Sequence, residues 1–171
     1  MATRTDLDKV WMVVSPQNPF KEKSSLANNY DRLHLLSLAI GENLNLQASD
    51  LEFNLPIPSY TIDTLTYLKE KYPDYQFSLI MGGDNIATFH KWKNYEKILE
   101  HHDIFVYQRP EYELGDLKTH PRVNILEAPL LSISASYIRK CIQDGYSIEY
   151  LVPKEVFYYL QENQIYRKIK A

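Results

Sequence analysis

Short apolar runs alternate along the chain with longer segments in which leucine and isoleucine recur at helical spacing. The short runs predict buried strands, because brief apolar stretches bounded by turn signals are typical of a parallel sheet. They are Lys9–Val14, Leu51–Leu55, Phe77–Met81, Ile104–Tyr107 and Val123–Leu126. The longer segments predict helices. These are Leu26–Ile40, Ser59–Tyr72, Asn94–His102, Ser134–Gln143 and Pro153–Asn163.

Turn and cap residues predict where several of these elements begin and end. Gly41 is expected to end the first helix, because glycine accepts the left-handed conformation that commonly follows a last turn. Ser59 or Thr61 is expected to cap the second helix, since a hydroxyl accepts a hydrogen bond from a free N–H group of the first turn. Pro56 and Pro58 are expected to stop the strand that precedes it.

The alternation of strands and helices continues without repeats, low-complexity tracts or linkers. It predicts one α/β domain over residues 1–171, with a Rossmann-like, mostly parallel sheet and helices on both faces. Ligands of such sheets bind beyond the carboxyl ends of the strands. Polar clusters at these ends are therefore the candidates for chemistry. They are Ser15–Lys23, Gly82–Asp84, Arg109–Pro110 and Ser132–Ser136.

Composition and charge exclude several classes of function. A net charge of -3 argues against a nucleic-acid-binding protein, for which a basic face is expected. No stretch reaches the roughly 18 apolar residues of a membrane span. Cys141 is the only cysteine, and His101–His102 has no partner at metal-ligand spacing. We therefore expect no disulfide and no protein metal site, and a cytoplasmic location is the natural expectation.

Gly82–Asp84 follows a predicted strand and precedes a short helical segment. Glycine there lets a ligand approach the backbone, and Asp84 is suited to accept hydrogen bonds from ribose hydroxyls. An ordinary turn with Asp84 as the N-cap is the alternative, and for this segment alone it is favoured.

Ser134, Ser136 and Arg139 stand at a predicted helix N-terminus, where free N–H groups, two hydroxyls and a guanidinium favour an anion. A serine-capped helix with a solvated arginine is equally consistent with the residues. Phe89 and Trp92 are spaced to stack an aromatic ligand or to form a core pair. Lys21 and Lys23 lie in a strand-end loop, where they neutralise a phosphate or remain solvated.

The order of these segments resembles that of the nicotinate mononucleotide adenylyltransferases of NAD synthesis, in the nucleotidyltransferase α/β-phosphodiesterase superfamily. The resemblance runs from about residue 7 to the C-terminus. The segments that carry it are Ser-Pro-Gln-Asn-Pro-Phe-Lys at 15–21, Pro-Ser-Tyr-Thr-Ile-Asp-Thr at 58–64, Met-Gly-Gly-Asp at 81–84, His-Lys-Trp at 90–92, Arg-Pro at 109–110, Ile-Ser-Ala-Ser-Tyr-Ile-Arg at 133–139 and Tyr-Leu-Val-Pro at 150–153.

The resemblance implies transfer of AMP from ATP to nicotinate mononucleotide, giving deamido-NAD and pyrophosphate, with Mg²⁺ accompanying ATP. It implies mononucleotide-binding residues and ATP-binding residues by position. The former are Asn18, Lys21, Tyr60, Thr61, Phe89 and Trp92; the latter are Gly82, Asp84, Arg109, Ser134, Ser136 and Arg139. Lys21, Ser136 and Arg139 are expected to neutralise charge during transfer.

Members of the family open with Gly-Gly-x-Phe-x-Pro-x-His-x-Gly-His, and no such motif occurs in these residues. Residues 1–6 instead resemble the tail of the first family helix, so we expect the first strand to be missing and the chain to be nearly inactive. Three alternatives stay open: a catalytically dead nucleotide-binding fragment, a phosphopantetheine-type or glycerol-phosphate nucleotidyltransferase, and a plain interaction domain. The residues also leave a homo-oligomer open.

Overall fold

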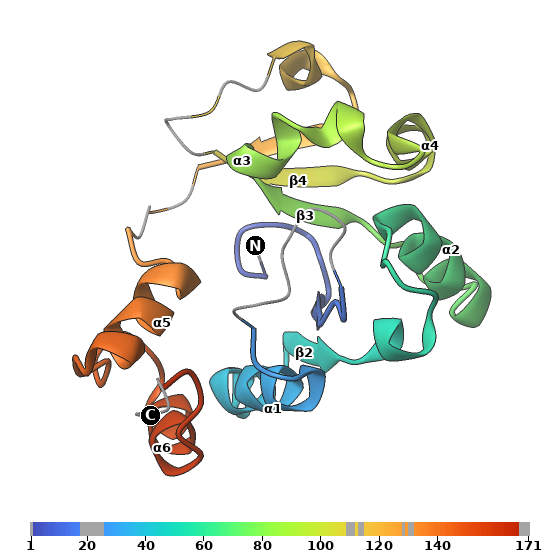
Figure 1. The fold of residues 1–171 in the computed structure, drawn as a ribbon. Helices are drawn as coiled ribbons and strands as arrows, with labels where there is room; N and C mark the ends of the chain where they lie inside the picture. Colours follow the sequence, from blue (N-terminus) through green and yellow to red (C-terminus); the bar gives the residue numbers. More distant parts are fainter. Residues whose placement is uncertain are drawn as a thin grey trace. The chain divides into compact units, whose positions relative to one another are not determined.

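The structure is a computed structural model, and it describes residues 2–17, 26–108, 112, 115–127, 129 and 132–167. The chain divides into two compact units, which are described separately (Figure 1). Unit 1 comprises Met1–Ser59 and Ser132–Ala171, and unit 2 comprises Tyr60–Leu131. A single domain over the whole chain stays a prediction. No helix of the described residues is both long and apolar enough to cross a membrane.

The sheet of unit 1 consists of two parallel strands, β1 (Val10–Val13) and β2 (Leu46–Ser49). Val10 lies opposite Leu46, and Val13 lies opposite Ser49. The helix α1 (Asn29–Ile40) connects them, as expected for a parallel crossover. The strand β1 is not fully buried, because Met12 is 41% exposed. The expectation of a buried strand at Lys9–Val14 is therefore wrong in part: among the described residues only β2 forms a ladder with it.

The strand expected at Leu51–Leu55 is wrong. Its residues form the 3₁₀-helix η2 (Leu51–Asn54), and the strand β2 ends just before it. Local hydrogen bonds hold η2, from the N–H of Phe53 to Asp50 O (2.8 Å) and from the N–H of Leu55 to Glu52 O (3.2 Å). Apolar content alone does not distinguish a short buried helix from a strand.

The helices of unit 1 begin and end close to their predicted positions. Asn28 caps α1 by accepting the N–H of Asp31, and Gly41 ends it with φ 55°. The helices α5 (Ala135–Asp144) and α6 (Lys154–Glu162) follow Ser134 and Pro153. Their apolar faces form one core of buried residues: Cys141, Ile148, Val156, Phe157 and Leu160. Residues 2–6 form turns and bends, so the expected helix tail is absent there.

Unit 2 contains a parallel sheet in the order β3-β4-β5. Its strands are Leu79–Gly82, Ile104–Tyr107 and Val123–Leu126. The described residues of unit 2 also form the helices α2 (Thr61–Lys71), α3 (Gly83–Ile86) and α4 (Tyr95–His101), which Figure 1 labels, and the 3₁₀-helices η3 (Phe89–Lys91) and η4 (Gly115–Thr119). A buried cluster joins the sheet to α2, α3 and α4, and its fully enclosed members include Phe89, Ile98, Ile104 and Val106. Parallel strands alternating with helices confirm the predicted α/β class.

Candidate active site

Gly82 ends β3 in close contact with a neighbouring strand. A Cβ atom at this position would lie 3.0 Å from both Cζ and Oη of Tyr107, and it would collide with the Asp84 carboxylate. Register places Tyr107 of β4 opposite Gly82, which explains the approach. The absence of a side chain at Gly82 is therefore required by the protein's own packing, at the sheet end where ligands of this architecture bind.

Asp84 does not cap a helix in the way the sequence suggested. Gly82 occupies the N-cap position of α3 with extended backbone and makes no side-chain cap bond. Asp84 instead lies in the first turn of α3, and its carboxylate lies beside the Cα of Gly82. The N-cap interpretation of Asp84 is wrong, because the helix begins at Gly83, two residues earlier than it would with Asp84 as its cap.

The first turn of α2 lacks a side-chain cap. Tyr60 is the N-cap, and neither Ser59 nor Thr61 takes that role, so the predicted cap is wrong. The carbonyl oxygen of Tyr60 accepts the N–H groups of Asp63 (3.0 Å) and Thr64 (3.2 Å). The first N–H groups of a helix without a side-chain cap have no partner within the helix. They point outward from its N-terminus, where the positive end of the helix dipole lies. This turn is consequently suited to a negatively charged ligand group.

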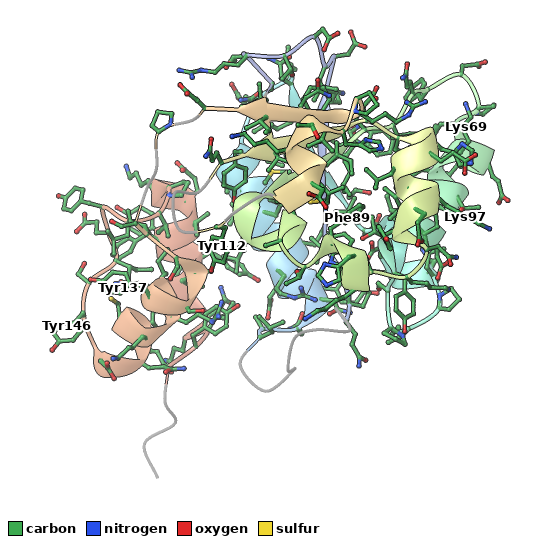
Figure 2. All side chains as sticks on the ribbon, turned by 90° about the horizontal axis from the view of Figure 1, so that it is seen from above. Lys69, Phe89, Lys97, Tyr112, Tyr137 and Tyr146 are labelled. Atoms are coloured by element: carbon green, nitrogen blue, oxygen red, sulfur yellow. The ribbon has the colours of Figure 1, made fainter. Side chains whose placement is uncertain are left out.

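Phe89 and Trp92 lie together at the end of η3. Their ring centroids are 5.3 Å apart in an edge-to-face arrangement, and the N–H of Trp92 donates to Phe89 O at 2.9 Å. Phe89, which is labelled in Figure 2, has a fully buried side chain, whereas Trp92 is half-buried. The core interpretation is confirmed for the Phe89 side chain, whose ring packs edge to face against the indole of Trp92. Trp92 keeps part of its indole surface accessible for stacking.

Lys93 connects this aromatic pair to the first turn of α2. Its Nζ lies 2.8 Å and 3.0 Å from the two carboxylate oxygens of Asp63, and 4.8 Å from the centroid of the Tyr60 ring. The sequence analysis missed Lys93. Its position directly after Trp92 was a signal for a role beside the stacking surface. The contact with Asp63 could not be predicted in this way, because the two residues are 30 positions apart.

The N-terminus of α5, in unit 1, brings the predicted phosphate-binding side chains together. Ser134 caps the helix by accepting the N–H of Tyr137 at 3.1 Å, so the capping interpretation is confirmed. One turn on, Nη2 of Arg139 donates to Ser136 Oγ at 3.0 Å. The guanidinium also lies 5.9 Å from the centroid of the Tyr166 ring. The cap does not conflict with anion binding, because the Ser136 hydroxyl and the guanidinium are exposed or half-buried.

Three predicted site residues, Asn18, Lys21 and Arg109, lie outside the described residues, as does Lys23. The remaining ones divide between the units, with Tyr60, Thr61, Gly82, Asp84, Phe89 and Trp92 in unit 2 and Ser134, Ser136 and Arg139 in unit 1. Within the part of the chain that the structure describes, no three His, Cys, Asp or Glu side chains are grouped to hold a metal ion.

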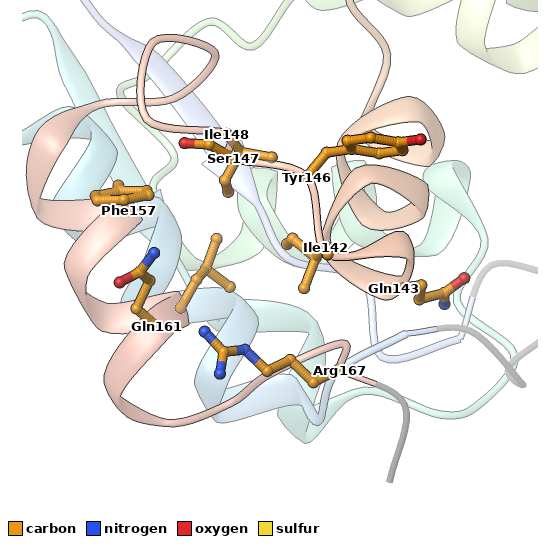
Figure 3. Close-up of a pocket in the computed structure, with 10 residues that line it drawn as sticks. Ile142, Gln143, Tyr146, Ser147, Ile148, Phe157, Gln161 and Arg167 are labelled. Atoms are coloured by element: carbon orange, nitrogen blue, oxygen red, sulfur yellow. The ribbon is translucent and has the colours of Figure 1, made fainter. Parts of the chain in front are cut away.

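A pocket of about 570 Å³ lies in unit 1 between α5 and α6 (Figure 3). Ile148, Phe157 and Leu160 line its apolar part, and Gln161 and Arg167 are among its polar residues. None of the predicted site residues lines it. The pocket therefore does not include the residues that carry the predicted chemistry, although the N-terminal end of α5 holds three of them.

The chain is similar to a large group of known proteins. Residues 1–141 match the model of the cytidylyltransferase-like family. A relative from Flavobacterium johnsoniae is 49% identical over 98% of this chain and 88% of its own length. A relative from Cytophaga hutchinsonii is 53% identical over 91% of this chain and 81% of its own. Both carry the name nicotinate-nucleotide adenylyltransferase.

A solved structure shows the same fold. It is the nicotinic acid mononucleotide adenylyltransferase of Plasmodium falciparum complexed with NaAD, with a TM-score of 0.76 and 22% sequence identity. The alignment covers 93% of this chain and 82% of that one. The family inferred from the order of the motifs is therefore confirmed. The chain belongs to the cytidylyltransferase-like family and, within it, to the nicotinate-nucleotide adenylyltransferases.

Proposed function

We propose that this chain binds ATP and nicotinate mononucleotide and serves adenylyl transfer between them in NAD biosynthesis. An oxygen of the mononucleotide 5′-phosphate attacks the α-phosphorus of ATP. The bond from that phosphorus to the bridging oxygen breaks, and pyrophosphate leaves with the bond's electron pair. The products are deamido-NAD and pyrophosphate. No covalent bond to the protein forms, so catalysis consists of positioning and charge neutralisation.

The observation that carries this proposal is the uncapped first turn of α2 beside Trp92. Nicotinate carries a negatively charged carboxylate, and the first N–H groups of α2 at Thr61 offer donors and a favourable dipole for it. The half-buried Trp92 offers a surface on which the pyridine ring stacks. Phe89 contributes its backbone and supports Trp92, since its side chain is enclosed. Tyr60 lies in the same turn and completes the mononucleotide side.

The proposed ATP-binding residues are Gly82 and Asp84 in unit 2, Ser134, Ser136 and Arg139 in unit 1, and Arg109, which lies outside the described residues. Asp84 follows Gly82 at the carboxyl end of β3, and its carboxylate suits the ribose hydroxyls of a nucleotide. The N-terminus of α5 and Arg139 suit the phosphates. Lys21 and Asn18 complete the proposal near the mononucleotide phosphate.

Mg²⁺ fits this proposal as a partner of ATP. The ion commonly keeps several waters and binds substrate phosphates with few protein carboxylates, so the proposal requires no cluster of protein ligands. When bound, it neutralises charge on the phosphates. Ser136 and Arg139 bind the same phosphates.

Binding and turnover are expected to differ for residues 1–171. The His-x-Gly-His motif, whose histidines hold the ATP phosphates in the family, does not occur in this sequence. Losing more than one such donor costs about 10²-fold or more in rate. We therefore expect binding of both substrates with slow turnover, measured as pyrophosphate release against a chain that carries the motif. Equal rates would contradict the expectation of slow turnover.

Calorimetric titration with nicotinate mononucleotide and with phosphopantetheine tests the proposed substrate. We expect nicotinate mononucleotide to bind and phosphopantetheine to bind far more weakly. Trp92→Ala is expected to weaken mononucleotide binding about tenfold, since stacking on an aromatic side chain contributes about 1–3 kcal/mol. Trp92→Phe is the matched control, because it retains a ring. Preference for phosphopantetheine would support the rival transferase, and binding of neither compound would support an interaction domain.

A further inference from the structure

We propose that Lys93 is a specificity-determining residue: by neutralising Asp63 it keeps the first turn of α2 attractive to a carboxylate and thereby favours the acid over the amide form of the mononucleotide. The inference rests on the proposed function, in which this turn receives the nicotinate group. It assigns a role to Lys93 and Asp63, neither of which is among the site residues that the family resemblance implies.

The contact between the two residues engages both oxygens of the carboxylate. Nζ of Lys93 lies 2.8 Å from Oδ2 and 3.0 Å from Oδ1 of Asp63. Both side chains remain accessible, at 44% for Lys93 and 45% for Asp63. An exposed pair of this kind adds little to folding stability. We therefore assign the ion pair an effect on the electrostatic field at the first turn of α2 rather than on folding stability.

Asp63 poses an electrostatic difficulty for a carboxylate ligand. An acidic side chain in the first turn stabilises its own helix by interacting with the positive end of the dipole. The same negative charge repels a second anion that approaches the turn. Lys93 removes this conflict, because a cation held against both oxygens cancels the field of Asp63 at short range. The uncapped N–H groups then act on the ligand without opposition.

Lys93 is also well placed to keep this turn next to the stacking surface. It follows Trp92 directly, and its ammonium group lies over the face of Tyr60, the N-cap of α2. Asn94, the next residue, adopts a left-handed conformation with φ 52° and opens α4. The chain therefore turns sharply just after Lys93. A structural clamp is the rival explanation of the contact, and charge-specific variants separate the two.

The test compares dissociation constants of nicotinate mononucleotide and nicotinamide mononucleotide by calorimetry for the wild-type chain and four variants. Lys93→Met leaves Asp63 charged and alone, so we expect binding of the acid to weaken about fivefold, while binding of the amide changes less than about twofold. Asp63→Asn is expected to leave binding of the acid as tight as in the wild type or tighter. The combined Lys93→Met and Asp63→Asn variant is expected to recover acid binding to within about twofold of the wild type. Lys93→Arg keeps the charge and is expected to preserve the preference.

A structural clamp would give a different pattern. If Lys93→Met weakens both mononucleotides equally, or if adding Asp63→Asn fails to restore acid binding, the inference is wrong. The thermal unfolding midpoint of each variant checks that folding is retained, and Lys93→Arg keeps the test decisive if Lys93→Met unfolds. A wild-type chain that binds neither mononucleotide would contradict the proposed function itself. A wild-type preference for the acid that survives Lys93→Met would contradict only the role of Lys93.

Discussion

The hydroxyl of Tyr159 on α6 donates a 2.9 Å hydrogen bond to Oδ1 of Asp31 on α1, across 128 positions of the chain. The Tyr159 ring also lies 4.5 Å from the ring of His34, one turn further along α1. Asp31 itself donates its N–H to the cap Asn28 at 2.9 Å. The C-terminal helix of unit 1 is thus joined to the first turn of α1.

Tyr159→Phe is expected to lower the thermal unfolding midpoint, because it deletes this hydrogen bond and keeps the ring. The bond to Asp31, with some burial and the charge of Asp31, raises the pKa of Tyr159 above its ordinary value of 10.0. A raised pKa in the folded state stabilises the protein below pH 10 and loses this effect as pH rises through the folded-state value.

Circular dichroism melts at pH 8 and at pH 11 measure both effects on Tyr159→Phe. The difference between wild type and variant is expected to be present at pH 8 and to shrink at pH 11. Tyr150→Phe is the control, because Tyr150 is 92% exposed. A deficit in Tyr159→Phe that stays constant across this range would contradict the assigned role of the hydroxyl.

Gly82→Ala is expected to destabilise the protein by about 1–3 kcal/mol, the usual cost of overpacking. The new methyl group would press on the Tyr107 ring at 3.0 Å and on the carboxylate of Asp84. ATP binding should weaken as well, because Asp84 must move. Urea unfolding and titration with ATP measure the two effects. Tyr107→Leu in the same chain should recover part of the lost stability, and Gly82→Ala with unchanged stability would show that the contact is not tight.

Arg139→Met is expected to weaken ATP binding about tenfold, since hydrogen bonds to charged groups contribute about 1.5–3 kcal/mol. The guanidinium is half-buried and is held by Ser136, so it is already oriented for a phosphate. Lys140→Met is the matched control, because it removes the same charge from the next position of the same helix. Titration with ATP at two salt concentrations compares them. Equal losses in the two variants would favour a general charge effect over a specific contact.

Much of the local structure followed from short-range signals in the sequence. The strands Ile104–Tyr107 and Val123–Leu126 have the bounds expected from their apolar runs. Gly41 ends α1 and Ser134 caps α5, because glycine and serine have conformational and hydrogen-bonding properties that act within one turn. The same reasoning failed at Leu51–Leu55, where a buried apolar run became a 3₁₀-helix. An apolar run specifies burial but not which backbone geometry achieves it.

The candidate site could likewise be predicted from the sequence only in part. The order of motifs sufficed for the family. It also predicts Thr61, Trp92, Asp84 and Arg139 as site residues, because these residue types stand at element ends suited to phosphates and rings. It did not reveal that Tyr60 rather than a hydroxyl stands at the cap of α2, and it left open whether the Phe89 side chain is enclosed in the core or available to stack on a ligand. Both depend on how η3 and α2 pack on the core of unit 2.

By itself the sequence determined the alternation of strands and helices, the chemical class of the site and the family, because each rests on the identity and spacing of neighbouring residues. The tertiary structure decided the contacts between distant positions. Lys93 meets Asp63 across 30 positions, and Tyr159 meets Asp31 across 128. Tyr107 lies against Gly82 only because β3 and β4 pair in one register. Such contacts depend on packing and register, which local propensity leaves undetermined.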